Sequence, residues 1–309
     1  MIQPLPPAPA VLDRRCEERN APGFLAGVQA GTSHKVMVMA QGKTLIAGNK
    51  VVFLDPDDLP DTEADSIYLG AVEIHQSLGA GTDVVLRVLM DDAGAEPWVP
   101  DGAVYRGYRE VAEQLDEADA AIFVQAQAVA NWHRSHSRCP RCGAETEVQW
   151  AGWMRRCTVD GSEHFPRTDP AVIVAIVGAD DRLLLANNFA WEENRYSTVA
   201  GFVEAGESAE QAAVREIFEE VGVHLHTVQY VGSQAWPFPR SLMMGYIGYT
   251  DSTVPVPDLT EVRGARWFSR EELQAEVLAG STIISHRLSI ARSLIEHWYG
   301  GKISEQGDE

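Results

Sequence analysis

Three glutamates close together in the sequence, Glu216, Glu219 and Glu220, are the residues whose spacing most clearly indicates chemistry. In a helix, positions i, i+3 and i+4 share one face, so these carboxylates are expected to cluster. At about 5 Å, each pair of charges repels by roughly 3 kcal/mol at an effective dielectric near 20, and by under about 1 kcal/mol in open water. The glutamates therefore form either a solvated acidic helix face or a site that shares a bound cation.

The helix that carries them is expected over residues 208–221. Ser208 and Gln211 have the spacing of a capping box, and Gly222 is typical of the residue just past a helix C-terminus. Four apolar residues at helical spacing predict the buried stripe of this helix: Val214, Ile217, Phe218 and Val221. Arg215, one turn before Glu219, is expected to hold that glutamate in place.

The stretch 201–223 combines these glutamates with glycines, an arginine and a loop glutamate in one long pattern, G-x5-E-x7-R-E-U-x-E-E-x-G-U, where U is aliphatic. The residues at its fixed positions are Gly201, Glu207, Arg215, Glu216, Ile217, Glu219, Glu220, Gly222 and Val223. The stretch thus resembles the Nudix box without a mismatch. The resemblance implies a loop-helix-loop that binds Mg²⁺ or Mn²⁺ and hydrolyses a nucleoside diphosphate linked to another moiety.

A second group of chemically distinctive residues is the run CPRC, with Cys139 and Cys142, followed after 14 residues by Cys157. Thiolates at this spacing are typical of a small zinc ribbon. A second C-x2-C knuckle would place a cysteine where Asp160 stands, so Asp160 is a candidate oxygen ligand and His164 is the nearest nitrogen alternative. We expect structural zinc here. The alternative is a ribbon without metal, held by two tryptophans, Trp150 and Trp153.

The same segment is locally basic, with five arginines: Arg134, Arg138, Arg141, Arg155 and Arg156. This charge serves either solubility or a contact with the polyphosphate or RNA part of a substrate.

Composition limits the class of protein. The 309 residues carry a net charge of −20 and are 45% hydrophobic, enough for more than one domain core. The acidic balance argues against a general nucleic-acid binder. The chain has no run of 18 apolar residues and its start lacks the pattern of a signal peptide, so we expect no membrane span and a cytoplasmic location. Four cysteines in such a chain favour reduced thiols and metal binding over disulfides.

The expected plan is a multi-domain α+β chain: an N-terminal α+β domain over 1–132, a zinc-ribbon-like segment over 133–167, and a Nudix domain over 168–309. In the first domain, a hairpin is expected to turn at Gln41-Gly42, and strands are expected at 51–54, 66–74 and 83–90. A helix is expected over 107–132, with Val111, Leu115, Ala118 and Ile122 on one face. Cys16 is expected to be a buried or incidental thiol rather than a ligand, and His34 and His75 are expected to be structural.

The expected strands of the third domain are residues 169–178, 182–186, 228–238, 242–250 and 265–269. Helices are expected over 270–279 and 286–298. Strands that enclose the helix of the box, with helices behind, match the α/β/α sandwich that the Nudix resemblance implies.

The segment SQAWPFPRS, residues 233–241, bears on the substrate because it sets Trp236 and Phe238 among prolines that stiffen it. It is either an ordinary proline-rich loop or a wall of a nucleotide pocket. With the box, the ribbon and the N-terminal domain, it resembles the SQPWPFPxS array of the NADH pyrophosphatase (NudC-like) subfamily of Nudix hydrolases. Ala235 departs from that array, and Asp160 departs from the ribbon's fourth cysteine.

This resemblance implies several substrate contacts. Phe202 would stack on the nicotinamide ring, and Phe165 would supply the opposing face, from the partner subunit of a homodimer. Glu261 would be a further acidic residue near the metals or the ribose, or else a surface glutamate. The other residues implied at the substrate are Ala200, Gln234, Trp236, Phe238 and Ser241.

The implied reaction is hydrolysis of the pyrophosphate of NADH or NAD⁺ to AMP and the nicotinamide mononucleotide, with removal of NAD caps from RNA as a related activity. Glu216, Glu219 and Glu220 would hold Mg²⁺ or Mn²⁺, with Glu207 supporting the metals and Arg215 orienting the glutamates. The general base would be Glu220, Glu219 or Glu261. The alternatives are a Nudix hydrolase of ADP-ribose or a dinucleoside polyphosphate, and a non-catalytic nucleotide-sensing or RNA-binding module.

Overall fold

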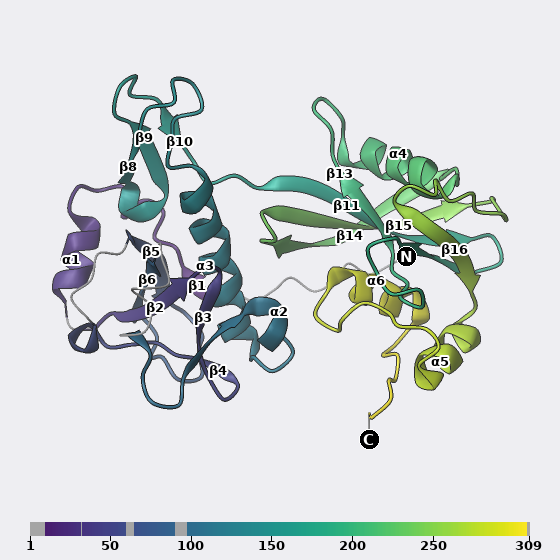
Figure 1. Ribbon diagram of the computed structural model, residues 1–309, viewed down its shortest axis with the longest axis horizontal. Helices are drawn as coiled ribbons and strands as arrows, with labels where there is room; N and C mark the ends of the chain where they lie inside the picture. Colours follow the sequence, from purple (N-terminus) through teal and green to yellow (C-terminus); the bar gives the residue numbers. More distant parts are fainter. Residues whose placement is uncertain (1–9, 32, 60–64, 90–97, 308–309) are drawn as a thin grey trace. The chain divides into compact units, whose positions relative to one another are not determined.

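The computed structural model describes residues 10–31, 33–59, 65–89 and 98–307 (Figure 1). Its contacts divide these residues into two compact units, one formed by 10–167 with 237–240 and the other by 168–236 with 241–307. Each unit has its own sheets and its own buried apolar clusters. The α+β fold class and the Nudix-type sandwich expected at the C-terminal end are confirmed.

The first unit contains a mixed sheet whose described strands run in the order β1-β5-β6-β2-β3-β4, with β7 paired to β3. The strands are β1 (Leu12–Asp13), β2 (Lys35–Ala40), β3 (Lys43–Ala47), β4 (Lys50–Val51), β5 (Asp65–Val72), β6 (Asp83–Leu89) and β7 (Val104–Gly107). The turn predicted at Gln41-Gly42 joins β2 to β3, with positive φ angles of 49° and 77°. The last residue of the strand expected over 83–90 lies outside the described residues.

The helices of this unit are α1 (Phe24–Ala30), α2 (Tyr108–Val111) and α3 (Glu117–Ser135). The single helix expected over 107–132 is therefore wrong. The side chain of Asp116 caps α3 by accepting a hydrogen bond from the backbone N–H of Asp119, and Leu115 lies between the two helices. The strand expected over 51–54 is also shorter, because beyond β4 only Leu54 pairs, in an isolated bridge to Val36.

A three-stranded ribbon, β8 (Thr146–Gln149), β9 (Met154–Cys157) and β10 (Glu163–His164), belongs to the same unit. Trp153 Nε1 donates to the Tyr68 carbonyl at 2.7 Å, and the His133 ring is bonded to the Gly152 carbonyl at 2.8 Å. Gly152 has φ 99°, a conformation that glycine adopts without strain. The ribbon is thus fastened to both β5 and α3.

The second unit is a six-stranded sheet in the order β14-β15-β11-β12-β16, with β13 paired to β11 (Figure 1). Its strands are β11 (Asp169–Gly178), β12 (Leu183–Asn188), β13 (Val199–Phe202), β14 (Thr227–Trp236), β15 (Ser241–Thr250) and β16 (Val262–Phe268). Helix α4 (Ala209–Val221) packs on one face, and α5 (Arg270–Ala279) and α6 (Ile290–Tyr299) pack on the other.

Several expected boundaries in this unit need correction. The strand expected over 228–238 ends at Trp236, and the strand expected over 265–269 begins earlier, at Val262. The helix expected over 286–298 begins only at Ile290, because the Ser289 side chain caps it by accepting from the Arg292 N–H. None of the described helices is both long enough and apolar enough to cross a membrane.

Gly152 provides a test of how the ribbon packs against β5. A Cβ at this position would fall 2.6 Å from Cγ2 of Ile67, a fully buried residue of β5. Gly152→Ala should therefore lower the free energy of unfolding by about 2 kcal/mol or more, from backbone strain and overpacking together. Urea unfolding followed by circular dichroism measures the loss.

The matched control is Gly102→Ala. This glycine also has a positive φ, 79°, but a Cβ there would meet no atom within 4 Å. Only the strain of about 1 kcal/mol should appear. Equal losses for the two variants would contradict the packing of Gly152 on Ile67.

Candidate functional site

Helix α4 carries the acidic cluster and ends as predicted. Ser208 and Gln211 form the capping box, with the Ser208 Oγ accepting from the Gln211 N–H at 3.2 Å, and Gly222 closes the helix at φ 64°. The predicted apolar stripe is partly wrong, because Val214 and Phe218 are 38% and 48% exposed. The helix rests on the sheet through small side chains, so its buried residues are Ala212, Ala213, Ile217 and Val221.

The guanidinium of Arg215 gathers carboxylates from the loop before this helix and from the helix itself. Its Nε and Nη2 donate to the two carboxylate oxygens of Glu207, both at 2.8 Å. Its Nη1 donates to one oxygen of Glu216 and one of Glu219, both at 2.9 Å, and Nη2 also donates to the Phe202 carbonyl at 3.0 Å. All five N–H donors of the side chain are therefore used.

Gly201, on β13, leaves the space that the Glu216 carboxylate occupies. A Cβ at residue 201 would fall 2.0 to 2.3 Å from the three carboxylate atoms of Glu216. Any other residue there would displace the Glu216 carboxylate from its hydrogen bond with Arg215. The first glycine of the box is thus explained by this close approach of strand and helix.

Glu220 and Glu261 meet at a small open pocket of the second unit. The backbone N–H of Asp258 donates to the Glu220 carbonyl at 3.0 Å, which ties the loop before β16 to the end of α4. The Asp258 carboxylate in turn accepts from the backbone N–H groups of Glu261 and Val262, at 3.0 and 2.8 Å. The pocket is lined by Ala186, Asn188, Trp191, Thr198, Val199, Ala200, Glu220, Glu261 and Val262.

The pKa values of the clustered carboxylates differ, because some are paired with Arg215 and others are buried close to further negative charges. Hydrogen bonds from Arg215 hold the pKa of Glu207 down at about 2. Burial raises the pKa of Glu220 to about 8, and the neighbouring charges of Glu216 and Glu261 raise it further. Burial also raises the pKa of Glu216, against the opposing effect of Arg215. Carboxylates in such surroundings favour either a proton or a cation.

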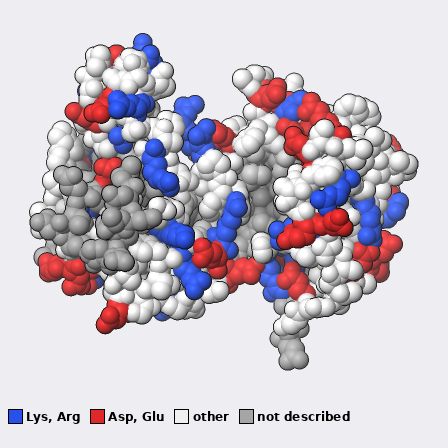
Figure 2. All heavy atoms as spheres, viewed as in Figure 1, with Lys and Arg blue, Asp and Glu red and all other residues white. Residues whose placement is uncertain are grey.

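The donor set fits a hard divalent cation, which prefers carboxylate oxygens. Arg215 uses one oxygen of Glu216 and one of Glu219, which leaves the second oxygen of each for a ligand. Acidic residues near the C-terminal end of a helix are opposed by the helix dipole, and α4 has no basic residue in its last turn to offset them. Figure 2 shows Asp and Glu side chains gathered over the part of the surface where α4 lies in Figure 1.

Five of the predicted substrate residues lie on strands of this unit: Ala200, Phe202, Gln234, Trp236 and Ser241. Phe202 ends β13 and is 55% exposed, and Ala200 on the same strand lines the pocket. Trp236, the last residue of β14, is paired with Ser241, the first residue of β15. The stretch 201–223 therefore includes one exposed aromatic ring close to its start, that of Phe202.

The amide of Gln234 is engaged at both ends inside the unit. Its Nε2 donates to the Leu288 carbonyl at 2.6 Å, and its Oε1 accepts from the Ile290 N–H at 2.8 Å. These bonds fasten β14 to the start of α6. The Gln234 side chain therefore holds the N-terminal end of α6 in place.

The segment 237–240 groups with the first unit. The ring of Phe238 stacks on Tyr108 at 5.9 Å between centroids, and the Arg109 guanidinium lies 4.7 Å from its centroid. Asn131 Nδ2 donates at 2.9 Å to the carbonyls of Pro237 and Pro239. The prolines and Phe238 are thus held by α2 and α3.

Phe165 follows β10 in the first unit and is 44% exposed. Its ring lies 5.5 Å from that of Trp150, at a tilt of 51°. The exposed part of this aromatic ring is available for a further contact.

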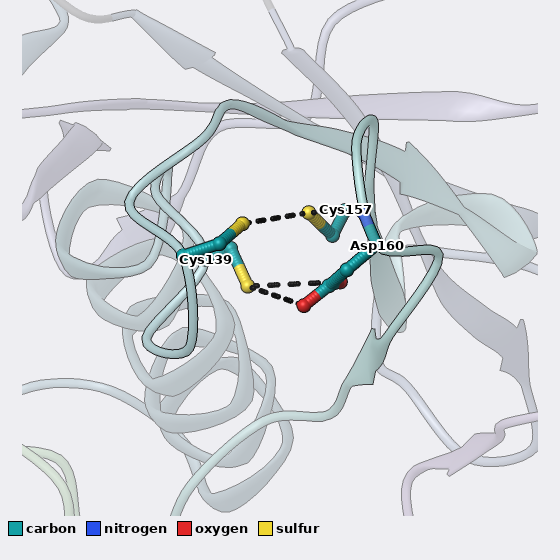
Figure 3. Close-up of side chains that lie close together, drawn as sticks. Cys139, Cys157 and Asp160 are labelled. Atoms are coloured by element: carbon teal, nitrogen blue, oxygen red, sulfur yellow. Dashed lines mark hydrogen bonds between the residues drawn. The ribbon is translucent and has the colours of Figure 1, made fainter.

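The three predicted cysteines and Asp160 converge in the ribbon (Figure 3). One ligand atom from each lies within 4.8 Å of all the others. The Sγ atoms of Cys142 and Cys157 are 3.4 Å apart, and Cys139 Sγ lies 3.8 Å from Asp160 Oδ2. Ligands bound tetrahedrally at about 2.0 to 2.3 Å from zinc are separated by comparable distances, so the set fits this metal.

The thiols of the cluster differ in their surroundings. The backbone N–H of Ala144 lowers the pKa of Cys142, but the neighbouring Cys157 thiol and burial raise it overall to about 11. Backbone N–H groups of Val159 and Asp160 point at Cys157 Sγ, at 3.4 and 3.3 Å. A hydrogen bond from Ser162 lowers the pKa of Cys139 to about 6. His164, the predicted alternative ligand, lies outside the cluster, and its Nε2 is 3.0 Å from Ser162 Oγ.

Six pocket residues were not predicted as site residues: Ala186, Val199 and Val262 on strands, and Asn188, Trp191 and Thr198. The last three form one group. They lie in or beside the loop between β12 and β13. A tryptophan in the loop directly ahead of the box is the signal that could have identified this wall.

Comparison with known proteins assigns a family description to each part of the chain. Residues 167–286 match the NUDIX domain, residues 134–165 match the NADH pyrophosphatase zinc ribbon domain, and residues 33–132 match the NADH pyrophosphatase-like rudimentary NUDIX domain.

Similar curated proteins cover most of the chain. The NAD-capped RNA hydrolase NudC of Mycobacterium bovis (strain BCG / Pasteur 1173P2) is 36% identical over 274 residues, 84% of this chain and 84% of that protein. The NAD-capped RNA hydrolase NudC of Stutzerimonas stutzeri (strain A1501) is 38% identical over 63% of this chain and 67% of its own length. The NAD-capped RNA hydrolase NUDT12 of Macaca fascicularis is 36% identical over 60% of this chain and 43% of its own length.

The crowding of Glu220 predicts a pH dependence of stability in buffer free of divalent ions. Its pKa rises from an ordinary value of 4.5 to about 8 in the folded chain. Between these values the folded chain holds a proton that the unfolded chain has released, so the free energy of unfolding falls as pH rises. Glu220→Gln should flatten this fall, measured as thermal midpoints from pH 5 to 8.

Glu271→Gln, which alters an exposed glutamate in the first turn of α5, is the control and should keep the native pH dependence. A Glu220→Gln variant whose midpoint falls as steeply as that of the native chain would overturn the assignment.

Proposed function

This chain belongs to the NudC family of Nudix hydrolases, and we propose that it hydrolyses the pyrophosphate bond of NADH and NAD⁺ to AMP and the nicotinamide mononucleotide. The same reaction at the 5′ end of an RNA removes an NAD cap. The observation that carries the proposal is the meeting of Glu220 and Glu261 at one pocket, beside the carboxylates that Arg215 gathers.

In this proposal Glu216, Glu219 and Glu220 hold Mg²⁺ or Mn²⁺, with Glu261 and Glu207 supporting the site. The bound cation neutralises charge that develops on the diphosphate oxygens. Arg215 keeps the glutamates of the box in fixed positions relative to Gly201 and Phe202. This role is supported by the use of all five of its N–H donors.

A carboxylate of the pocket accepts the proton of the attacking water. Glu219 is half exposed and paired with Arg215, whereas Glu220 and Glu261 line the pocket. The proton acceptor is therefore assigned to Glu220 or Glu261. Attack is in line with the leaving oxygen, as for other phosphoryl transfers.

The substrate's nicotinamide stacks on Phe202, whose exposed ring supports this role. Ala200, Trp236 and Ser241 form the neighbouring wall on β13, β14 and β15. Gln234 and Phe238 act indirectly in this proposal, by fixing the strand end and the proline segment, because their side chains are already engaged.

The proposal includes a homodimer in which Phe165 of one chain reaches the substrate of the other. The exposed part of the Phe165 ring supports it. Sedimentation equilibrium should therefore give a particle mass of twice the 33.9 kDa of one chain. We also propose that the protein is cytoplasmic, because a reducing compartment keeps its three clustered thiols reduced.

The direct test is incubation of the intact chain with NADH and Mg²⁺ or Mn²⁺, followed by chromatography. AMP and reduced nicotinamide mononucleotide should appear in equal amounts. Glu220→Gln should lower kcat by about 100-fold or more, since it removes both a metal ligand and a candidate base. Glu271→Gln should keep the native rate.

Comparison of Glu220→Gln with Glu261→Gln identifies the proton acceptor, as the variant with the flatter pH–rate profile on the acidic side. Faster cleavage of ADP-ribose than of NADH, judged by kcat/KM, would shift the proposal to another diphosphate substrate. Absence of products from any of these nucleotides would contradict the enzyme itself.

The ribbon is proposed to hold one structural zinc through Cys139, Cys142, Cys157 and Asp160. Elemental analysis should therefore find about one zinc per chain, and Cys157→Ser should lose most of it. Asp160→Cys, which restores a fourth thiolate, should retain the metal. A native chain purified without chelators that holds no zinc and takes up none on titration would contradict this site.

A further inference from the structure

Trp191 is a large aromatic residue without a structural task in the described part of the chain. It belongs to none of the buried apolar clusters, and its ring makes no aromatic or cation–π contact there. Its indole N–H has no hydrogen-bond partner among the described residues, whereas Nε1 of Trp267 and of Trp298 donate to backbone carbonyls at 3.0 Å. A half-buried indole with no such contacts is unusual, because tryptophan normally contributes packing or a hydrogen bond.

The position of Trp191 suggests what it contacts. It is the one aromatic residue among those that line the pocket of Glu220 and Glu261, as far as the described residues show. With a volume of about 110 Å³, the pocket is far too small to enclose a dinucleotide. Most of a bound dinucleotide must therefore extend past the residues at the wall of this pocket, among them Trp191.

The loop holds Trp191 from both sides. Before it, the Asn188 side chain accepts from the Ala190 N–H at 2.8 Å, and the Asn188 carbonyl accepts from the Trp191 N–H at 3.0 Å. After it, the buried Asn187 amide donates to the carbonyls of Glu192 and Arg195, at 2.8 and 2.6 Å. These hydrogen bonds fix the loop backbone on both sides of Trp191.

The same loop is joined to the strand that follows Glu261. The Phe189 N–H donates to the Glu261 carbonyl at 2.9 Å, and Arg263 lies over the Phe189 ring and donates to its carbonyl. The loop that carries Trp191 and the backbone of Glu261 are therefore held together. Such preorganisation lowers the entropy cost of substrate binding.

We propose that Trp191 is a substrate-binding residue whose indole stacks on a planar ring of the dinucleotide while the diphosphate lies at Glu220 and Glu261. This inference rests on the proposed function, and it adds a specificity-determining residue outside the box. Stacking of a base on an aromatic side chain is lost on substitution by a small residue and largely retained by another aromatic ring.

The test measures kcat and KM for NADH and for ADP-ribose, which lacks the nicotinamide ring, with the native chain, Trp191→Ala, Trp191→Leu and Trp191→Phe. Trp191→Ala and Trp191→Leu should raise KM for NADH by about 5- to 100-fold with a much smaller change in kcat. Trp191→Phe should restore most of the affinity. A rise in KM for both substrates identifies adenine as the stacked ring, and a rise for NADH alone identifies nicotinamide.

Tyr230→Ala is the control, because Tyr230 is an exposed aromatic residue of β14 that does not line the pocket. It should keep native KM values. Unchanged KM values in Trp191→Ala and Trp191→Leu, with a native chain that cleaves NADH, would overturn this inference and leave the proposed function standing. A folded native chain that cleaves neither nucleotide would overturn both.

Discussion

One guanidinium group holds the acidic cluster of this protein together. Arg215 contacts Glu207 from the loop before α4, Glu216 and Glu219 from α4 itself, and the backbone of Phe202 on β13. Like charges brought this close would repel one another by several kcal/mol outside open water, and the arginine offsets part of that cost. It leaves one oxygen of Glu216 and one of Glu219 for other ligands. The remaining negative charge is what a divalent cation and a diphosphate would meet.

The rest of the second unit adds groups to this cluster from separate parts of the chain. Asp258 ties Glu261 to the end of α4 through backbone hydrogen bonds, and the loop after β12 ties Trp191 to Glu261. Each connection has a backbone group at one end or at both, which fixes positions more firmly than contacts between two flexible side chains would. A rigid frame of this kind suits a reaction whose catalysis depends mainly on positioning and electrostatic stabilisation.

The sequence was most informative where one residue type is required by local geometry. The capping box at Ser208, the left-handed Gly222 and the pairing of Arg215 with Glu219 could all be read from spacing, and the fold class followed from the box. The buried face of α4 could not, because small alanines set how closely the helix approaches the sheet. Phe238 and Gln234 were expected at the substrate from their motif, yet their contacts lie with Tyr108 and with the start of α6, which depends on tertiary packing. Trp191 carried no motif, and only the folded loop brings it to the pocket.

The central claim is that Arg215 organises a cation-binding cluster. Titration with Mn²⁺, followed by electron paramagnetic resonance of the free ion, tests it in the native chain and in Arg215→Lys, which keeps the charge but not the five donors. The account predicts Mn²⁺ binding to the native chain and an affinity at least about tenfold weaker in the variant, since residues that orient metal ligands have effects of this size. Equal affinity in two equally folded proteins, or no binding by the native chain, would contradict it.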